Sequence, residues 1–395
     1  MSWSTVRADQ FCTLITDGTH DSPKPQQSGW KLITSKHLKG HYIDFDSANW
    51  ISEADYLKVI SRSAVEQWDI LFSMIGTIGN IYLEKNPHVE YACKNMGIFK
   101  FSGNKENALW MYYYLKSPQA KAYIQTHLRG STQAYVPLGG LREMPVPVPP
   151  QSVRNEIIAV LRPIDEKIEC NNAINDNLQQ QAQSYFQELF VDNADPEWTT
   201  GTICDLGAVV GGSTPSKAKP EYYTESGIAW ITPKDLSINK SKFVSHGEND
   251  ITELGLKNSS AAIMPEGTVL FSSRAPIGYI AIAAGEVTTN QGFKSVVPKP
   301  EIGTPFVYFF LKNTLPVIEG MASGSTFKEV SGSTMKNVPA VIPDAETLAK
   351  FSDFCAPIFA QQRILEEQNQ SLATLRDNLL PKLMSGEIDV SAVQL

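Results

Sequence analysis

The chain has 395 residues, which is enough for two domains with separate hydrophobic cores. A hydrophobic content of 42% is that of a folded protein, and the longest apolar runs are too short to cross a bilayer. The first residues lack the basic segment and apolar stretch of a secretory signal. Five scattered cysteines without a C-x-x-C pair argue against a disulfide framework or a zinc site and favour a cytoplasmic protein.

The net charge of −8 is unlike that of a strongly basic nucleic-acid-binding protein. The charge is uneven, however, because residues 1–150 hold 15 basic and 13 acidic groups, whereas residues 344–395 hold 4 and 8. A chain of this kind is expected to bind DNA weakly alone and to rely on partners for positive surface. A protein that never contacts nucleic acid fits the net charge at least as well.

Residues 1–150 are predicted to form a first globular domain of strands and helices. Short apolar runs such as Ile70–Met74 indicate strands, and glycine and proline separate them. The domain ends in the proline-rich segment 145–150. Because proline fixes φ and has no N–H to donate, this exit is expected to be an extended, stiff connector.

Residues 151–190 are predicted to form a long spacer helix with two apolar rows. One row repeats every seven residues from Ile157, and its companion row starts at Leu161. Pro163 predicts a kink or a new helix start inside this segment. Asn175 would form a polar layer that costs stability but fixes the register.

Residues 191–343 repeat the first domain. Leu71-Phe72-Ser73 matches Leu270-Phe271-Ser272, and Asn95-Met96-Gly97 matches Asn290-Gln291-Gly292. From residue 130 to residue 189, 11 of 60 positions are identical to the residue 194 positions later. This is about three times the roughly one match in 16 that average composition gives. The repeat predicts a second domain with the same fold.

Residues 344–395 are predicted to form a second spacer helix and a tail, with Pro357 and Asn369 at the places of Pro163 and Asn175. The two helices can bury their seams against each other, and antiparallel pairing is the simpler route because the chain must return. Alternatively, each helix packs only on its own domain. The apolar seam is predicted to consist of Ile157, Leu161, Ile164, Ile168, Leu178, Leu189, Phe351, Ile358, Leu365, Leu372, Leu379 and Leu383.

The predicted fold is therefore α+β. Two similar globular domains are separated by two long helices that pair as an antiparallel coiled coil, with approximate two-fold symmetry.

Signatures of catalysis are missing from the sequence. It contains no G-x-x-x-x-G-K-[ST] phosphate-binding loop and no N/D-P-P-Y/F motif of aminomethyltransferases, and its six histidines lack metal-ligand spacing. An autonomous nuclease or methyltransferase is therefore disfavoured. A rival of another class is a scaffold or interaction protein whose duplicated domains bind protein or glycan.

Several motifs, in this order and doubled, resemble the specificity subunits of type I restriction–modification systems over essentially the whole chain. They lie at residues 17–23, 211–216, 228–236, 273–278 and 290–294, and a helix follows each copy. The resemblance implies two target-recognition domains, each of which reads half of a bipartite DNA target with an unread spacer between. It also implies methyltransferase (modification) subunits and a restriction/translocase subunit as partners. S-adenosylmethionine, ATP and Mg would be bound by those partners, with no cofactor, metal or membrane association in this chain.

The candidate DNA contacts are loop residues with suitable donors and acceptors. Arg suits guanine and Asn or Gln suits adenine in the major groove, whereas Lys and hydroxyl groups more often hold phosphates. Each could also be an ordinary turn or surface residue. The candidates are Thr19, His20, Lys24 and Lys36 in the first domain and Ser213, Thr214, Lys217, Lys219, Lys234, Arg274, Asn290, Gln291 and Lys294 in the second.

The repeated tripeptides Gly130-Ser131-Thr132 and Gly324-Ser325-Thr326 are a further candidate. They are predicted either to form an anion-binding turn of exposed amides or to cap a helix.

Overall fold

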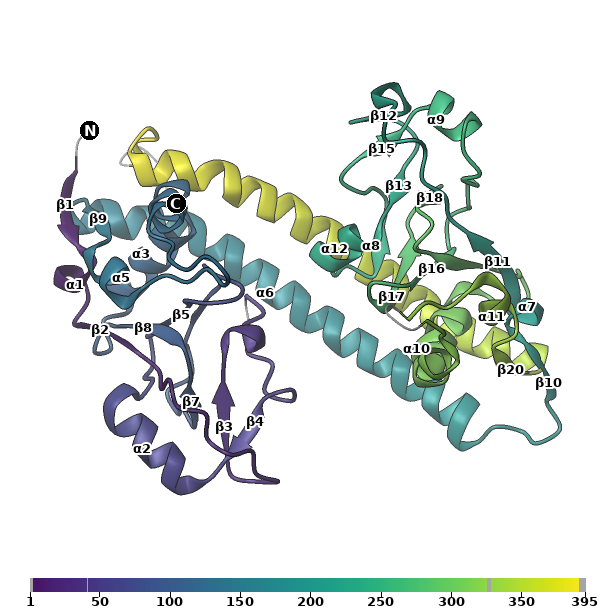
Figure 1. The fold of residues 1–395 in the computed structure, drawn as a ribbon, viewed down its shortest axis with the longest axis horizontal. Helices are drawn as coiled ribbons and strands as arrows, with labels where there is room; N and C mark the ends of the chain where they lie inside the picture. Colours follow the sequence, from purple (N-terminus) through teal and green to yellow (C-terminus); the bar gives the residue numbers. More distant parts are fainter. Residues whose placement is uncertain (1–2, 41, 325–327, 391–395) are drawn as a thin grey trace. The chain divides into compact units, whose positions relative to one another are not determined.

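The computed structural model describes residues 3–40, 42–324 and 328–390, and the chain divides into two compact units (Figure 1). The first unit contains the residues up to 169 together with those from 371 onward. The second unit is the continuous segment Cys170–Gln370. Each unit thus contains a globular part and one half of each long helix.

The core of the first unit is built on an antiparallel sheet with the strand order β2-β8-β5-β6. Its central strand β5 is buried at every position, which explains why its sequence is almost wholly apolar. A second sheet has the order β4-β3-β7, in which β3 is antiparallel to β4 and parallel to β7. The strands are β2 (Leu14–Asp17), β3 (Trp30–Ile33), β4 (Asn49–Ile51), β5 (Ile70–Ser73), β6 (Ile81–Leu83), β7 (Tyr91–Cys93) and β8 (Met96–Lys100).

Helix α3 is the most deeply buried helix of this globular part, since every residue from Ala108 to Leu115 is buried. Its tryptophan, Trp110, donates its indole N–H to the carbonyl oxygen of Pro147 at 2.8 Å. The helices are α1 (Ala8–Phe11), η1 (Ser35–His37), α2 (Glu53–Ser63), α3 (Lys105–Lys116), α4 (Pro118–Thr126) and α5 (Leu138–Glu143).

The proline-rich exit is extended, as predicted, but it is a paired strand rather than a free connector. Strand β9 (Pro145–Val148) pairs antiparallel with β1 (Ser4–Arg7). Pro145 and Pro147 alternate with Val146 and Val148, so every second residue keeps an N–H for the ladder. The matching proline-containing segment at the end of the second globular part does the same, because β20 (Pro339–Ile342) pairs with β10 (Thr199–Thr202).

The second unit contains a five-stranded sheet of order β11-β19-β16-β17-β14, in which β14 is parallel to β17. The parallel pair β13–β18 and the antiparallel pair β12–β15 complete its strands. The bounds are β11 (Gly207–Gly211), β12 (Tyr223–Thr224), β13 (Trp230–Ile231), β14 (Phe243–Val244), β15 (Asp250–Ile251), β16 (Val269–Ser273), β17 (Ile277–Ala283), β18 (Thr288–Thr289), β19 (Lys294–Pro298), α7 (Ile203–Leu206), η3 (Pro220–Tyr222), α8 (Pro233–Ile238), α9 (Glu253–Lys257), α10 (Thr304–Met321) and α11 (Gly332–Lys336).

The two units repeat one topology, as the sequence predicts. The order β2-β8-β5-β6 corresponds to β11-β19-β16-β17, and the parallel pair β3–β7 corresponds to β13–β18. They differ mainly in two places. Within the described residues, only the sheet of the second unit has a strand in the position of β14, and α2 is longer than α9.

The long helices are α6 (Gln151–Gln187), which η2 (Glu188–Asp192) continues, and α12 (Ala345–Ser385). In the first unit, Ile157 and Leu161 of α6 share a core with Leu380 and Leu383 of α12. In the second unit, the ring of Phe186, near the end of α6, packs against the ring of Phe351, near the start of α12. The two ring centres lie 5.8 Å apart. The residue numbers in contact rise along one helix and fall along the other, which confirms antiparallel pairing.

Each half-helix also packs on the globular part of its own unit, because the core of the first unit includes residues of α3 and the core of the second unit includes residues of α10. The alternative in which each helix packs only on its own domain is therefore wrong. A new helix start at either internal proline is also wrong, because α6 and α12 are continuous through Pro163 and Pro357.

The predicted seam positions are all buried or partly buried. Six are buried, namely Ile157, Leu161, Phe351, Ile358, Leu365 and Leu383. The other six are partly exposed, namely Ile164, Ile168, Leu178, Leu189, Leu372 and Leu379.

Amide side chains form a polar layer between the helices of the second unit. The Nδ2 of Asn171 donates to the Oδ1 of Asn369 at 2.9 Å, and the Nδ2 of Asn369 donates to the Oδ1 of Asn172 at 2.8 Å. Asn175 contributes its backbone carbonyl, which accepts from the Nε2 of Gln362 at 3.1 Å. Such a layer costs stability but pairs only in one register.

Within the described part of the chain, no helix has the length and apolar character needed to span a membrane.

Candidate nucleic-acid interface

A close contact between the loop after β11 and the turn after β18 gathers four predicted contacts of the second unit. A Cβ atom on Gly212 would lie 2.0 Å from the carbonyl oxygen of Asn290, so only glycine fits there. The backbone N–H of Ser213 donates to the carbonyl of Thr289 at 2.8 Å. The hydroxyl of Thr214 donates to the Oε1 of Gln291. Ser213, Thr214, Asn290 and Gln291 therefore lie together at one edge of the unit.

Arg274 and Lys294 lie beside this contact. The Nζ of Lys294 donates to the carbonyl oxygens of Gln291 and Phe293 at 3.3 and 3.2 Å, and its burial lowers its pKa. Arg274 donates to the carboxylate of Glu329 at 3.4 Å. The same carboxylate acts electrostatically on Lys294, so these two cations share one acidic neighbour.

The three remaining predicted lysines of the second unit are more exposed. Lys234 follows the first residue of α8, and that residue, Pro233, abuts the turn at Gly292. Its Nζ lies 2.5 Å from a carboxylate oxygen of Glu248. Lys217 and Lys219 lie farther along the loop, before η3, and are exposed.

The first unit builds the same contact from different residues. A Cβ atom on Gly18 would lie 2.3 Å from the carbonyl oxygen of Cys93, and the N–H of Thr19 donates to that oxygen at 2.9 Å. A side-chain hydrogen bond also recurs, since the Nδ1 of His20 lies 2.8 Å from the Oδ1 of Asn95. Gly18, Thr19 and His20 thus correspond to Gly212, Ser213 and Thr214.

The backbone sets a different register from the sequence match of Asn95 with Asn290. The N–H of Lys94 donates to the carbonyl of Ile33 at 2.9 Å, as that of Asn290 donates to Ile231 at 3.0 Å. Lys94 therefore corresponds to Asn290, and Asn95 to Gln291. The sequence match was shifted because it aligned Gly97 with Gly292, which lie at different distances from the turn. Lys94 and Asn95 were therefore missed as candidates.

Lys24 and Lys36 are exposed in the first unit. Lys24 borders a hollow of 380 Å³ that Thr19 and Lys58 also line. Lys36 lies on η1 two residues after Thr34, just as Lys234 follows Thr232 at the start of α8. Lys36 and Lys234 thus occupy equivalent places.

Two basic residues of α2 were also missed by sequence reasoning. The Nζ of Lys58 donates to Asp21 at 3.0 Å, and the Nη2 of Arg62 donates to the carbonyl oxygen of Gly18 at 3.0 Å. Both contact the segment of residues 18–21 from a distant part of the chain. We call this segment, and residues 212–214 of the second unit, the glycine-anchored loop. Only their recurrence on one helix face, at i and i+4, could have indicated them.

The Gly130-Ser131-Thr132 turn is exposed and lies between Arg129 and Tyr135, whose backbones exchange two hydrogen bonds of 2.9 Å. The next helix, α5, has Pro137 as its N-cap, so this tripeptide caps no helix. Its role as an anion-binding turn stays a prediction. In the second copy, Ser325 and Thr326 lie outside the described residues.

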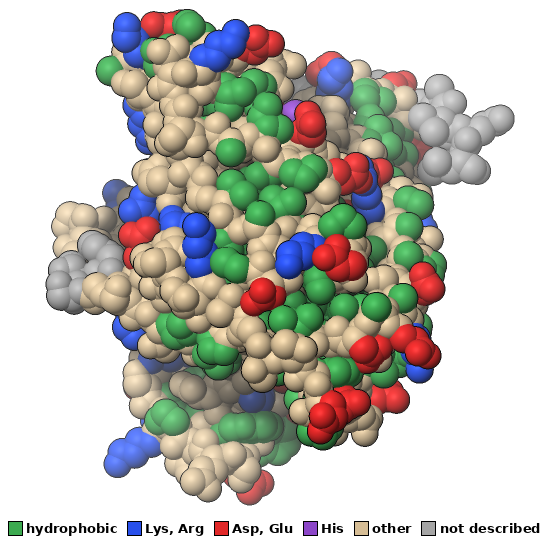
Figure 2. All heavy atoms as spheres, turned by 90° about the vertical axis from the view of Figure 1, so that its right-hand side faces the viewer, with side chains coloured by type: hydrophobic (Ala, Val, Ile, Leu, Met, Phe, Trp, Pro, Cys, Tyr) green, Lys and Arg blue, Asp and Glu red, His purple; other side chains and the backbone are tan. Residues whose placement is uncertain are grey.

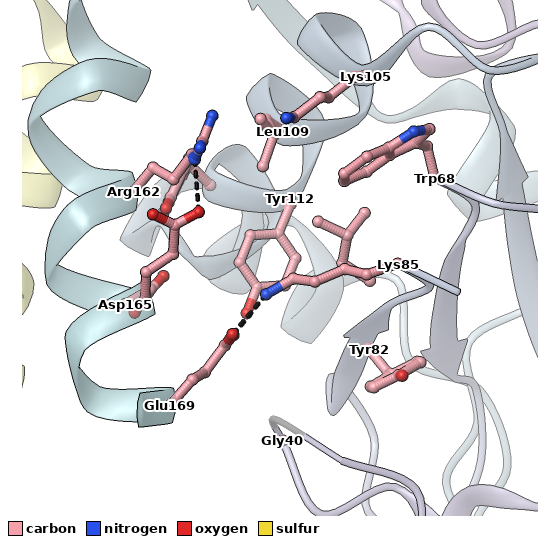
Figure 3. A pocket seen from close by; sticks show the side chains of 13 residues that line it. Gly40, Trp68, Tyr82, Lys85, Lys105, Leu109, Tyr112, Arg162, Asp165 and Glu169 are labelled. Atoms are coloured by element: carbon pink, nitrogen blue, oxygen red, sulfur yellow. Dashed lines mark hydrogen bonds and ion pairs between the residues drawn. The ribbon is translucent and has the colours of Figure 1, made fainter. Parts of the chain in front are cut away.

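A pocket of 120 Å³ in the first unit contains none of the predicted contacts (Figure 3). It lies where the sheet edge and α3 meet α6. Lys85 pairs there with Glu169 at 2.5 Å, and Arg162 pairs with Glu166 at 2.6 Å. The Lys85–Glu169 pair spans the junction between the globular part and α6, whereas the Arg162–Glu166 pair lies within α6.

The corresponding junction of the second unit is built around Lys242, which is only 7% exposed. Its Nζ donates to the Oε1 of Gln362 at 2.6 Å and lies 3.8 Å from the ring centre of Phe359. Burial lowers the pKa of Lys242 to about 7. The carboxylate of Glu366 accepts from the backbone N–H groups of Lys242 and Phe243, and burial raises its pKa. The two units are thus joined to their helices by different chemistry.

The surface charges are mixed. On the face shown in Figure 2, basic side chains lie among acidic and apolar ones rather than in one continuous patch. Among residues 3–40, 42–324 and 328–390, no group of three or more His, Cys, Asp or Glu side chains could hold a metal ion. All five cysteines are unpaired.

Comparison with known proteins finds the type I restriction modification DNA specificity domain twice, at residues 3–180 and 196–375. The chain is 39% identical over 194 residues to the Type I restriction enzyme MjaIX specificity subunit of Methanocaldococcus jannaschii, a match that covers 47% of this chain and 45% of that relative. It is 22% identical to the Type I restriction enzyme HindI specificity subunit of Haemophilus influenzae, over 86% of this chain and 90% of that relative.

A solved structure with a similar fold is the type I restriction-modification S subunit from M. genitalium. It has a TM-score of 0.56 and 16% identity, and the match covers 97% of this chain and 96% of that one. The two domain matches account for most of the sequence, and each contains one copy of the glycine-anchored loop. The chain therefore belongs to the family of type I restriction modification DNA specificity domains.

Proposed function

We propose that this chain is the DNA-recognition subunit of a type I restriction–modification complex and binds a bipartite target with an unread spacer. Each unit would bind one half of the target at its glycine-anchored loop, where the predicted contacts gather. The observation that carries this proposal is the recurrence of that loop, with the same backbone hydrogen bonds, in both copies of a DNA specificity domain.

Catalysis would belong to partners, namely methyltransferase subunits and a restriction/translocase subunit. S-adenosylmethionine, ATP and Mg would be bound by those partners in the cytoplasm. The net charge of −8 supports this division, because an acidic chain gains little affinity from phosphates and needs additional positive surface from partners.

The test is selection from a random duplex library by the chain in complex with its methyltransferase subunits. We expect enrichment of a split motif, with half-sites centred about 10 bp apart if both lie on one face of the duplex. If no split motif is enriched, the scaffold alternative with protein- or glycan-binding domains is favoured.

A further inference from the structure

The two units share the strands and the backbone contacts of the glycine-anchored loop, which we call the shared frame. They differ in the segments that lie beside this loop. Helices α2 and α9 begin at equivalent positions. The Oγ of Ser52 accepts from the N–H of Asp55 at 3.1 Å, and the Oγ1 of Thr252 accepts from that of Gly255 at 3.1 Å. After this common start the units diverge, because α2 continues for 11 residues and α9 ends after five.

In the first unit, the additional turns of α2 lie against the glycine-anchored loop. Lys58 pairs with Asp21, and Arg62 holds the carbonyl oxygen of Gly18. Their side chains nevertheless remain 73% and 57% exposed. These donors therefore stand at the rim of the loop and are open to a ligand.

In the second unit, the segment 258–263 takes the place of those turns and also contacts the glycine-anchored loop. The Oγ of Ser260 donates to the Oγ of Ser213 at 3.1 Å. The Nδ2 of Asn258 donates to the carbonyl of Leu254 at 2.8 Å, which ends α9. The cationic donors of the first unit are thus replaced by hydroxyl and amide groups.

A feature that is identical in both units cannot distinguish one half-site from the other. Contacts to phosphates position a protein, whereas contacts to base edges specify the sequence. What the two units share, namely the backbone hydrogen bonds of the loop and a lysine at the equivalent places of Lys36 and Lys234, is therefore suited to the first task. The divergent segments beside it are suited to the second.

We propose that half-site specificity resides in these divergent segments, namely residues 58–62 of α2 in the first unit and residues 258–263 in the second, while the shared loop frame holds phosphates. This inference rests on the proposed function. It also assigns chemistry. Lysines more often hold phosphates, but a Lys or Arg donor that reaches a base edge favours guanine, so the first half-site is expected to contain a guanine read from α2.

The test uses the chain in complex with its methyltransferase subunits and compares four substitutions by library selection and by binding at several salt concentrations. Lys58→Ala should reduce discrimination about tenfold at one or more positions of the first half-site and leave the second unchanged. Ser260→Ala should reduce discrimination in the second half-site and leave the first unchanged.

The matched controls are Lys36→Ala and Lys234→Ala on the shared frame. They should weaken binding to all sequences alike, lower the salt slope by about one and preserve both halves of the motif. The inference is overturned if Lys58→Ala leaves the first half unchanged or alters both halves, or if a control changes the motif. If the unsubstituted complex selects no split motif, the proposed function itself has failed.

Discussion

Two glycines decide whether the loops can reach their neighbouring strand ends. Gly18 and Gly212 leave no room for a side chain, because the carbonyl oxygens of Cys93 and Asn290 occupy the place of a Cβ atom. These oxygens are backbone atoms, so they can move only if the strand ends move as well. The predicted DNA contacts that follow each glycine depend on this approach.

Gly212→Ala should therefore displace the loop from β18 and break the 2.8 Å hydrogen bond between Ser213 and Thr289. We expect a loss of about 2 kcal/mol in the free energy of unfolding, as for other strained core substitutions, and weaker DNA binding. Denaturant unfolding and a binding titration measure the two effects. Gly211→Ala is the matched control, because the nearest atom to its Cβ lies at 3.9 Å. Equal effects of the two substitutions would contradict this account.

Lys242 gives the second unit a predicted dependence on pH. Its pKa is about 7 when folded and 10.5 when exposed, so the unfolded chain binds more protons between these values. Stability should therefore rise with pH from 7 to 10.5 and fall as the pH returns to 7. The Lys242 contribution is at most about 1.4 kcal/mol per pH unit in this window.

Lys242→Met should flatten this dependence in denaturant unfolding at pH 7, 8 and 9. Other titratable groups face the same site, namely Tyr308 and Lys312 of α10 and Cys355 and Glu366 of α12. They remain in the variant, so the difference between the two slopes isolates Lys242. If the slopes are the same, the charge of Lys242 is not the cause.

At the scale of elements, the long helices could be predicted because a seven-residue apolar repeat is a local property of the sequence. Their antiparallel pairing also followed, since the chain returns after a second domain. The polar layer was only half predicted. Asn369 lies in it, but its partners are Asn171 and Asn172, and side-chain partners depend on the relative rotation of the helices.

The shared loops were located from the sequence because they carry glycine and hydroxyl residues in a repeated order. The equivalence of Lys94 and Asn290 could not be found in this way, because it rests on hydrogen bonds to β3 and β13. Lys242 was missed as well. A lone lysine in a polar loop gives no indication that it will be buried against aromatic rings.

The helices of the first unit are tied by a buried carboxylate. Asp165 lies 3.2 Å from Lys116 of α3 and 2.8 Å from Arg376 of α12, and it is 8% exposed. Burial alone would raise the pKa of Asp165, but these two positive charges outweigh it and lower that pKa. One residue thus joins two helices to the globular part.

Asp165→Asn should cost about 3 kcal/mol of unfolding free energy, because it leaves two partly buried cations without their common, buried partner. Glu166→Gln, one residue along the same helix, is the matched control. That carboxylate is 50% exposed and pairs only with Arg162 among the described residues, so we expect a loss below about 0.5 kcal/mol. Chemical denaturation of both variants gives the comparison. Similar losses would show that the exposure of an ion pair does not decide how much it contributes to the free energy of unfolding.

At the scale of the whole molecule, the paired helices are expected to set the distance between half-sites. Insertion of one heptad after Glu169 and another after Gln370 lengthens both helices by about 10 Å. The preferred spacer should then grow by about 3 bp, which library selection measures directly. Insertion into α6 alone is the control, since it shifts the polar layer of Asn171 and Asn369 and should destabilise the protein instead. An unchanged spacer in the double insertion would refute this role of the helices.

The first unit is assembled from both ends of the chain, and this sets an order for folding during synthesis. Leu380, Leu383, Met384 and Val390 belong to its core, although most of that core precedes residue 170. A ribosome releases residues 170–370 earlier, so the second unit can fold while the N-terminal part of the first unit still lacks the residues from 371 onward. A message cut short before codon 371 would therefore yield a chain with one finished unit and one exposed, aggregation-prone core.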